Sequence, residues 1–237
     1  LVITGPPGVG KSTFLKVFSK LYGAVVESPE EKIVIATRSD LVGKYLGSSA
    51  QKTTEIVEKA RGGILCIDEV YSLCDHDKRD FFVTEAVNCL TYLIDKYQDE
   101  LVVVIAGYKE ETVTQFFAQN SGMERRFDNW IDMDKYTSEE LFQIFEKCCK
   151  QKGWTVDRDC KETIQNVDFK NHAADIISLV KRIEVTQNCK NWATAVPGIH
   201  VTTNVKATDL QNEIDEFIMD RSRHKPEMKE FPLYMYT

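Results

Sequence analysis

Apolar residues form short, nearly continuous runs in the first half of the chain. These runs are rich in β-branched side chains and cover residues 1–4, 32–37, 63–68 and 101–107. Short runs that are apolar almost throughout are typical of parallel strands buried on both faces. Helical spacing of apolar residues lies between them, over residues 12–21 and 82–97. Strands that alternate with helices predict a doubly wound α/β domain with a parallel sheet. Residues 130–133 fit a fifth strand, at the edge of the sheet.

The pattern changes after residue 134, where only helical spacing is found. Thr137 followed by Glu140 is a capping-box signature, in which each side chain satisfies a free backbone N–H of the other residue. Gly153 marks the end of this helix, because glycine is common just past a helix C-terminus. The apolar stripe in between consists of Leu141, Phe142, Phe145 and Cys149.

Two further amphipathic helices are expected downstream. One carries the apolar stripe Ala173, Ile176, Ile177, Val180 and Ile183. The other opens at the capping-box pair Thr208 and Gln211, and residues 188–205 between them read as an irregular loop. Its stripe is Leu210, Ile214, Phe217 and Ile218. We therefore predict an α/β domain over residues 1–134, a small helical domain over residues 135–222 and a tail over residues 223–237.

Composition narrows the class of protein. The chain has 237 residues, 43% of them hydrophobic, which suits one large domain or two unequal ones. Its longest apolar runs have the length of strands, so we expect no membrane insertion. The net charge of −7 disfavours nucleic acid as a partner but leaves room for a local basic patch. Because the chain begins inside an apolar run at Leu1, we read it as part of a longer protein from which a targeting signal can have been removed.

Cysteine and histidine spacing gives no sign of a structural metal or a disulfide framework. Seven cysteines lack any CxxC pair, and the four histidines are far apart in sequence. Cys66 lies within a strand-like run, where it is expected to pack as a small apolar group. We expect a reduced, intracellular protein of the cytoplasm.

A glycine-rich segment with the pattern GxxxxGKS follows the first predicted strand and opens the first predicted helix. In this context its backbone N–H groups converge on phosphates, with a helix N-terminus behind them. Lys11 supplies positive charge to the β- and γ-phosphates, and the Ser12 hydroxyl reaches Mg²⁺. The predicted nucleotide contacts are Gly5, Pro6, Pro7, Gly8, Val9, Gly10, Lys11, Ser12 and Thr13. The expected cofactors are ATP and Mg²⁺.

An acidic pair ends the third apolar run and complements this loop. Asp68 is expected to hold Mg²⁺ together with Ser12, and Glu69 to polarise the water that attacks the γ-phosphate. An apolar run that ends in Asp-Glu is common and often structural, but here it accompanies a phosphate-binding loop. The two motifs together predict an ATPase that cleaves the β–γ phosphoanhydride.

Four blocks of sequence carry a more specific resemblance. They read RSDLVGKYLGSSAQKT (38–53), GGILCIDEVYSL (62–73), DELVVVIAGYKEE (99–111) and MERRFDNWIDMDKYTSEEL (123–141). In these blocks the chain resembles the AAA+ ATPases, in the subgroup of the red-type Rubisco activase CbbX and stage V sporulation protein K. The resemblance covers roughly residues 1–150 and implies a P-loop NTPase domain followed by a helical lid domain. Similarity of this kind is informative about the fold and the ATPase chemistry. It says little about the client, the molecule on which the ATPase acts.

The resemblance implies two further roles. Tyr45 and Leu46 match the first pore loop, which grips polypeptide in the centre of a ring; the alternative is a tyrosine that caps the core from a loop. Arg126 matches the arginine finger, which reaches the ATP of a neighbouring subunit. Arg125 is adjacent and can take this role instead, and the alternative for Arg126 is a solvated surface arginine.

Two positions depart from the wider AAA+ pattern. Tyr108 stands where the first sensor is usually Asn, and we count it among the nucleotide contacts. The lid arginine is expected near Ala173-Ala174-Asp175, where no residue can replace it. Because the sequence begins at the first predicted strand, we expect the upstream segment that covers the adenine in this family to lie outside it. We therefore expect ATP to bind, and we assign no residue of the lid to the response to hydrolysis.

We therefore interpret the chain as a ring-forming, ATP-dependent remodelling factor, a hexamer that acts on a protein client. Two alternatives stay open. The same ATPase core can serve a nucleic-acid motor or loader, which would be favoured by a basic pore or an appended DNA-binding domain. It can also serve as a non-hydrolysing, ATP-gated switch. Phosphate release, and its stimulation by polypeptide or DNA, separates the three.

Overall fold

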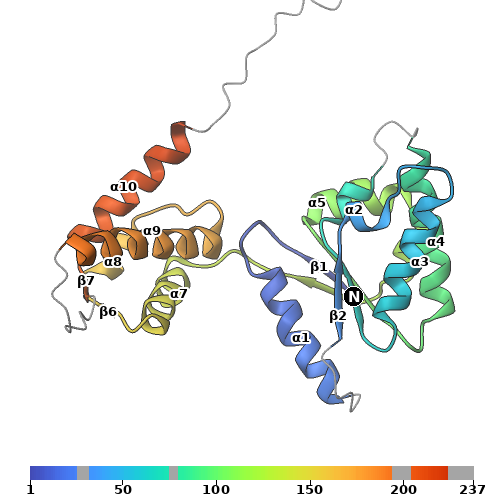
Figure 1. The fold of residues 1–237 in the computed structure, drawn as a ribbon, viewed down its shortest axis with the longest axis horizontal. Coiled ribbons are helices and arrows are strands. Elements are labelled where there is room, and N and C mark those ends of the chain that lie inside the picture. The colour runs from blue at the N-terminus through green and yellow to red at the C-terminus, as the bar shows by residue number, and fades with distance from the viewer. Residues whose placement is uncertain (26–31, 75–79, 194–203, 224–237) are drawn as a thin grey trace, which may run out of the picture. The chain divides into compact units, whose positions relative to one another are not determined.

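The computed structural model describes residues 1–25, 32–74, 80–193 and 204–223. The chain divides into two compact units, one from Leu1 to Lys135 and one that begins at Tyr136 (Figure 1). Two clusters of buried apolar side chains lie within the first unit and one within the second. No helix of the described residues is both long enough and apolar enough to cross a bilayer.

The first unit is built on a five-stranded sheet in which every pairing is parallel. The strand order is β2-β3-β4-β1-β5, so β1 lies between β4 and β5, and β3 lies beside β4. The strands are β1 (Val2–Thr4), β2 (Ile33–Ala36), β3 (Ile64–Ile67), β4 (Val102–Gly107) and β5 (Trp130–Asp132). Because all five run in one direction, the segments that follow β1, β3, β4 and β5 emerge at the same edge of the sheet.

Helices cover both faces of this sheet. Leu15 of α1 (Lys11–Val25) packs with Ile3 and Cys66 on one face, whereas Val57 of α3 (Ser48–Ala60) and Leu90 of α4 (Phe81–Lys96) belong to the core of the other face. Burial raises the pKa of the Cys66 thiol to about 12, so it packs uncharged, as expected. The shorter helical segments are α2 (Arg38–Leu41), η1 (Val70–Leu73), α5 (Lys109–Glu111), the π-helical η2 (Thr112–Phe117) and α6 (Ser121–Glu124). The predicted parallel α/β fold is confirmed.

Helix α3 was not expected, and its buried face explains why. The residues that it buries are Ser49, Thr53, Val57 and Ala60, of which the first two are polar. Both hydroxyls are satisfied by backbone groups: the Gly43 N–H donates to Ser49 Oγ at 3.0 Å, and Thr53 Oγ1 donates to a carbonyl of α2 at 3.2 Å. Because two of its buried positions are polar, apolar residues do not recur at helical spacing along α3, and the sequence pattern does not reveal the helix.

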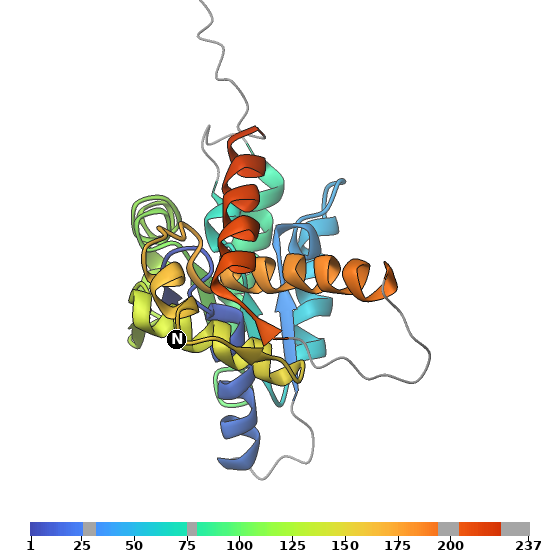
Figure 2. The same cartoon turned by 90° about the vertical axis from the view of Figure 1, so that its left-hand side faces the viewer.

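The second unit is mainly helical. It contains α7 (Ser138–Gln151), α8 (Cys160–Gln165), α9 (His172–Ala193) and α10 (Ala207–Arg223), and Figure 2 shows α10 running across α9. The capping box at the start of α7 is confirmed, since Thr137 and Glu140 exchange side-chain-to-backbone hydrogen bonds. The predicted stop is confirmed too: Gly153 has a φ of 73°, and the N–H of Trp154 donates to the Cys149 carbonyl at 3.0 Å. This is the Schellman arrangement of a helix C-terminus.

Three expectations for this unit are wrong. The region is not only helical, because β6 (Thr155–Val156) pairs in parallel with β7 (Asn204–Val205). The predicted loop is partly helix, since no glycine or proline interrupts residues 172–193 and α9 continues to Ala193. Helix α10 begins at Ala207, one residue before the predicted capping residue, with the Lys206 carbonyl accepting its first hydrogen bond.

Two of the predicted core positions in this unit are exposed. Ile177 of α9 is 45% exposed, and Ile218 of α10 is 49% exposed. Helical spacing includes both in the apolar stripes, but each lies at the edge of its stripe. The predicted tail from residue 224 on lies outside the described residues.

Candidate functional site

The loop between β1 and α1 depends on glycine geometry. Gly8 and Gly10 have φ angles of 76° and 95°, in the left-handed region that favours glycine. Gly5 has a φ of 152°, and a Cβ there would lie 2.6 Å from the carbonyl oxygen of Met133, at the end of β5. The loop and the end of β5 are therefore so close that only glycine fits at position 5.

Lys11 begins α1 and folds back over this loop. Its Nζ donates to the carbonyl oxygens of Gly5 at 2.8 Å and Pro6 at 3.0 Å. Burial lowers the pKa of Lys11, and the charges of Asp68 and Glu69 act in the opposite direction. The lysine charge therefore lies within the electrostatic reach of both acidic residues. Val9 is buried in the loop, Pro6 is half-buried, and Pro7, Ser12 and Thr13 are exposed.

The acidic pair follows β3 directly. Asp68 is tied to the neighbouring strand, since its N–H donates to the Ala36 carbonyl at 2.9 Å, and its carboxylate accepts from the N–H of Glu69 at 3.0 Å. Glu69 adopts the left-handed conformation with a φ of 51° and a ψ of 47°. A non-glycine residue in this region costs on the order of 1–3 kcal/mol, and such strain is concentrated at functional sites.

Two stacked tyrosines connect the lysine side of the site to the glutamate side. The rings of Tyr71 and Tyr108 lie 5.2 Å apart at an angle of 12°, and Lys11 Nζ lies 5.2 Å from the centre of the Tyr108 ring. Partial burial and then the Glu69 carboxylate raise the pKa of the Tyr71 phenol, so it stays protonated. Tyr108 follows β4, the strand between β1 and β3, which explains its place between the two motifs.

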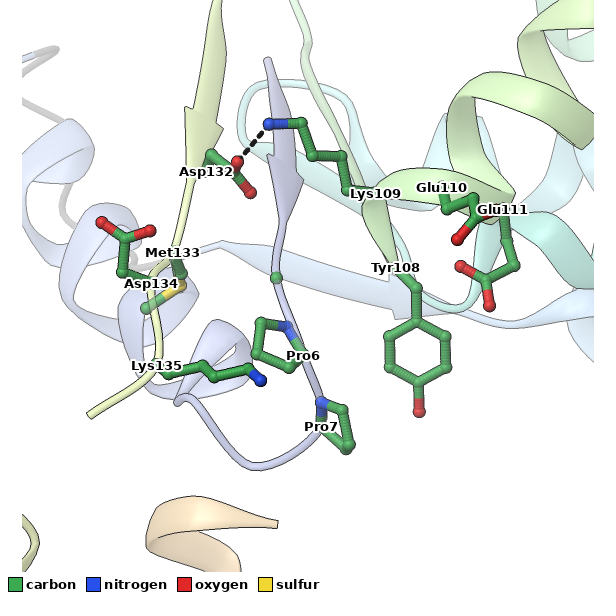
Figure 3. A pocket seen from close by; sticks show the side chains of 11 residues that line it. Pro6, Pro7, Tyr108, Lys109, Glu110, Glu111, Asp132, Met133, Asp134 and Lys135 are labelled. Atoms are coloured by element: carbon green, nitrogen blue, oxygen red, sulfur yellow. Dashed lines mark hydrogen bonds and ion pairs between the residues drawn. The ribbon is translucent and has the colours of Figure 1, made fainter. Parts of the chain in front are cut away.

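A cavity of about 580 Å³ opens beside the loop. Its wall comes from the ends of β1, β4 and β5, and Figure 3 shows Pro6 and Pro7 with the Tyr108 ring on one side and Lys135 on the other. Asp132 accepts a hydrogen bond from Thr4 Oγ1 at 2.9 Å and forms an ion pair with Lys109. The lining residues are Gly5, Pro6, Pro7, Tyr108, Lys109, Glu110, Glu111, Asp132, Met133, Asp134 and Lys135. A second cavity has a volume of about 440 Å³, and Glu69, Arg38 and Ser72 contribute to its wall.

Comparison with known proteins identifies the family. Residues 1–130, more than half of the chain, match the family described as ATPase family associated with various cellular activities (AAA). The chain is an AAA family member.

Curated relatives of this AAA chain carry related names. A Protein CfxQ homolog of Cyanidium caldarium is 30% identical over 219 residues, which cover 87% of this chain and 75% of that protein. A chloroplastic Protein cbbX homolog of Guillardia theta is 34% identical over 161 residues, 68% of this chain and 43% of that protein. The ESX-3 secretion system protein EccA3 of Mycobacterium tuberculosis is 36% identical over 152 residues, 64% of this chain and 24% of that protein.

These relatives confirm the resemblance to the CbbX subgroup. This AAA chain spans about half the length, or less, of most of the curated relatives that it matches. Among solved structures, the FIGL-1 AAA domain superposes with a TM-score of 0.61 at 16% identity, over 94% of this chain and 76% of that one. That likeness shows the fold alone.

The predicted pore-loop residues lie apart from this site, on the loop between α2 and α3 of the AAA domain. Tyr45 is 76% exposed and Leu46 is 80% exposed. The alternative that Tyr45 caps the core is therefore wrong. Ser48 Oγ closes the loop by donating to the Tyr45 carbonyl at 2.6 Å and accepting from the Tyr45 N–H at 3.0 Å.

The two arginines of the AAA domain's finger motif differ in their surroundings. The Arg126 side chain is 26% exposed and forms a two-pronged ion pair with Asp95 near the end of α4. Arg125 is exposed, and no side-chain hydrogen bond or ion pair of Arg125 is found within the described ranges. Arg126 is thus an ion-paired arginine, and both its role as a finger and the alternative of a surface arginine stay predictions.

Four residues of the site were not expected from the sequence. Tyr71 stacks on Tyr108, Asp132 and Lys109 line the larger cavity, and Asp95 binds Arg126. Tyr71 and Lys109 stand directly beside the predicted motifs, so proximity in sequence was an available signal. Asp132 had a signal of the same kind, since it lies at the end of the predicted fifth strand, whereas Asp95 had none, because it meets Arg126 only through the fold.

Proposed function

We propose that this AAA domain binds ATP with Mg²⁺ and hydrolyses its β–γ phosphoanhydride. The observation that carries the proposal is the convergence of Lys11, Asp68, Glu69 and Tyr108 at the carboxyl ends of β1, β3 and β4. Family membership supports it, because the matching family is a family of ATPases. Lys11 brings a positive charge, and Asp68 and Glu69 bring two carboxylates, as phosphoryl transfer to water requires.

The loop residues fit a bound polyphosphate. Gly8 and Gly10 hold the backbone in conformations that turn N–H groups inward, and α1 presents its N-terminus behind them. Ser12 is exposed at the first turn of α1, and Asp68 is half-buried at the end of β3. A hydroxyl and a carboxylate are oxygen ligands of the kind that Mg²⁺ prefers, with water and phosphate oxygens completing its shell.

Each of these residues has a role in the proposed reaction. Lys11 exchanges the carbonyl oxygens of Gly5 and Pro6 for phosphate oxygens, and Glu69 accepts a hydrogen bond from the attacking water. Bound Mg²⁺ offsets negative charge on the phosphates. Tyr108 keeps its ring beside Lys11 and replaces the polar sensor side chain that is usual after this strand.

The experiment that tests this proposal is steady-state phosphate release by the Glu69→Gln variant. The amide cannot polarise water as a carboxylate does, so turnover is expected to fall by about 10²–10⁴-fold while the Kd for ATP stays close to that of the wild type. Glu55→Gln is the matched control, because Glu55 is an exposed residue of α3 and its exchange makes the same charge change. Wild-type turnover in Glu69→Gln would refute the assignment of the base.

We also propose that the domain works in a ring, as a hexamer, and remodels a polypeptide client. Tyr45 and Leu46 support this, because two large apolar side chains are fully presented on one loop. Arg126 supports it as well, since its described contacts are with Asp95 and Gly122 and none is with the phosphate loop of its own chain. An ATP-dependent activity of this kind belongs inside the cell. Stimulation of turnover by DNA, or no turnover at all, would favour the motor or the switch instead.

A further inference from the structure

Arg126 is held more firmly than an exposed arginine. Its Nε donates to one carboxylate oxygen of Asp95 at 2.6 Å, and one terminal nitrogen pairs with the other oxygen. The second terminal nitrogen donates to the Gly122 carbonyl. The hydrogen bond from Arg126 lowers the pKa of Asp95, and the same bond raises the pKa of Arg126. The pair is therefore charged throughout the neutral range.

The chain around Arg126 is anchored by its neighbours. Met123 is 1% exposed and Phe127 is 4% exposed, and the Phe127 ring packs against Phe117 at a centroid distance of 6.1 Å. Arg126 thus extends from a fixed stretch of backbone, and Asp95 fixes its far end. Arg125 leaves the same stretch of backbone, but its side chain has no partner within the described structure that fixes its far end.

The hydrogen bonds leave a specific part of the guanidinium free. An arginine side chain has five N–H donors. Asp95 takes two of them and Gly122 takes a third, so one N–H remains on each terminal nitrogen. These two N–H groups, here called the free fork, are the donors with which the guanidinium can bind phosphate oxygens.

We infer that Asp95 is a positioning residue, which holds the Arg126 guanidinium so that this free fork is available to a phosphate of the nucleotide bound by a neighbouring copy. The inference rests on the proposed function, because it requires that Arg126 act in trans. It also explains why the structure favours Arg126 over the adjacent Arg125 as the finger. An arginine that is already oriented loses less side-chain freedom on binding.

The plain alternative is a surface ion pair that only stabilises the fold. Asp95 is 55% exposed in its side chain, and pairs of this kind contribute little to stability. That alternative predicts a small change in melting temperature and no change in turnover. The positioning role predicts the opposite, so the two are separable by one set of variants.

The test compares Asp95→Asn, Arg126→Ala and the double variant in the 237-residue chain, with Asp99→Asn as control. Asp99 is an exposed aspartate four residues further on, so the charge change is the same. ATP affinity is measured by titration of a fluorescent ATP analogue, turnover by phosphate release, and folding by a thermal melt. A misplaced catalytic group costs up to about 10²-fold in rate, so Asp95→Asn should lose about 10- to 100-fold in turnover with unchanged affinity. The double variant should be no slower than Arg126→Ala, because both changes remove one function.

A mixing experiment shows where Asp95 acts. Lys11→Ala subunits lack a working nucleotide site but keep Asp95 and Arg126, whereas Asp95→Asn subunits keep the nucleotide site. If Asp95 orients a finger that acts in trans, mixed assemblies should regain turnover that neither variant has alone. Asp95→Glu, which retains the charge, should lie between Asp95→Asn and the wild type.

The outcomes distinguish the two proposals. Wild-type or raised turnover of Asp95→Asn, with Arg126→Ala inactive, overturns the positioning role and leaves the finger intact. Wild-type turnover of Arg126→Ala overturns the finger, and the positioning role with it. If Asp95→Asn fails to fold, Asp95→Ser takes its place in the turnover assay and in the mixtures, and wild-type turnover of Asp95→Ser overturns the positioning role.

Discussion

Replacement of Lys11 by Ala is the most direct test of the nucleotide site. In the structure the lysine Nζ donates to two carbonyl oxygens of the loop, those of Gly5 and Pro6. We expect these two bonds to be exchanged for bonds to phosphate oxygens when ATP binds. The variant removes the donor and the charge but no buried apolar group, so the fold should persist.

The magnitude follows from this exchange. A hydrogen bond with an ionised donor or acceptor contributes about 1.5–3 kcal/mol. A bond from the lysine to a neutral carbonyl lies near the lower end of this range and a bond to a phosphate oxygen at or above the upper end, so each exchange gains about 1–2 kcal/mol and the two gain about 2–4 kcal/mol. At 1.4 kcal/mol per factor of ten, Lys11→Ala should raise the Kd for ATP roughly 30- to 700-fold.

The assay is an equilibrium titration with a fluorescent ATP analogue in the presence of Mg²⁺. Lys16→Ala is the matched control, because Lys16 is an exposed lysine of the same helix. An unchanged Kd for Lys11→Ala, or an equal loss in Lys16→Ala, would refute the assignment of the site. A thermal melt of both variants excludes unfolding as the cause.

The pH dependence of the same titration gives a second signature. Burial lowers the pKa of Lys11 in the free chain, whereas a bound phosphate favours the protonated amine and raises that pKa. Affinity is therefore full below the pKa of the free chain and falls as the pH rises through it. This fall should begin at lower pH than for an exposed lysine, and Lys11→Ala should lack it.

Two further predictions concern a surface loop and the second unit. Tyr45→Ala should melt like the wild type, because the side chain is 76% exposed, and should keep basal turnover but lose its stimulation by unfolded casein; Tyr92→Ala, an exposed tyrosine of α4, should lose nothing. Normal stimulation would remove Tyr45 from the client site. Arg221→Ala should lower the free energy of unfolding by about 2–3 kcal/mol in a urea titration, because it leaves the buried carboxylate of Asp175 unpaired. A loss no larger than that of the exposed Arg158→Ala would show that water replaces the arginine.

Local signals in the sequence were sufficient for the sheet and for the two motifs of the site. Strands β1 to β4 are apolar runs whose length and composition mark them without reference to the rest of the chain. The phosphate loop needs glycines at defined positions before a lysine, and this need is visible in the sequence as well. The structure adds a reason that the sequence does not show: at Gly5 a side chain would collide with the Met133 carbonyl oxygen, which follows β5.

The helices show where local signals end. Helix α7 was predictable with both ends, because Thr137, Glu140 and Gly153 act on their own backbone. Helix α3 was not, because its buried face contains Ser49 and Thr53, whose hydroxyls are satisfied by groups outside the helix. Whether a polar residue is buried depends on the partner that the fold supplies.

The sequence alone determined the fold class, the AAA resemblance and the residues proposed to contact the phosphates. The tertiary structure decided which other residues join them. Tyr108 lies beside Lys11 because β4 is placed between β1 and β3, and Asp95 meets Arg126 because α4 ends where the segment after α6 passes. A backbone motif is encoded in adjacent residues, whereas a contact between distant side chains exists only once the strands and helices are packed.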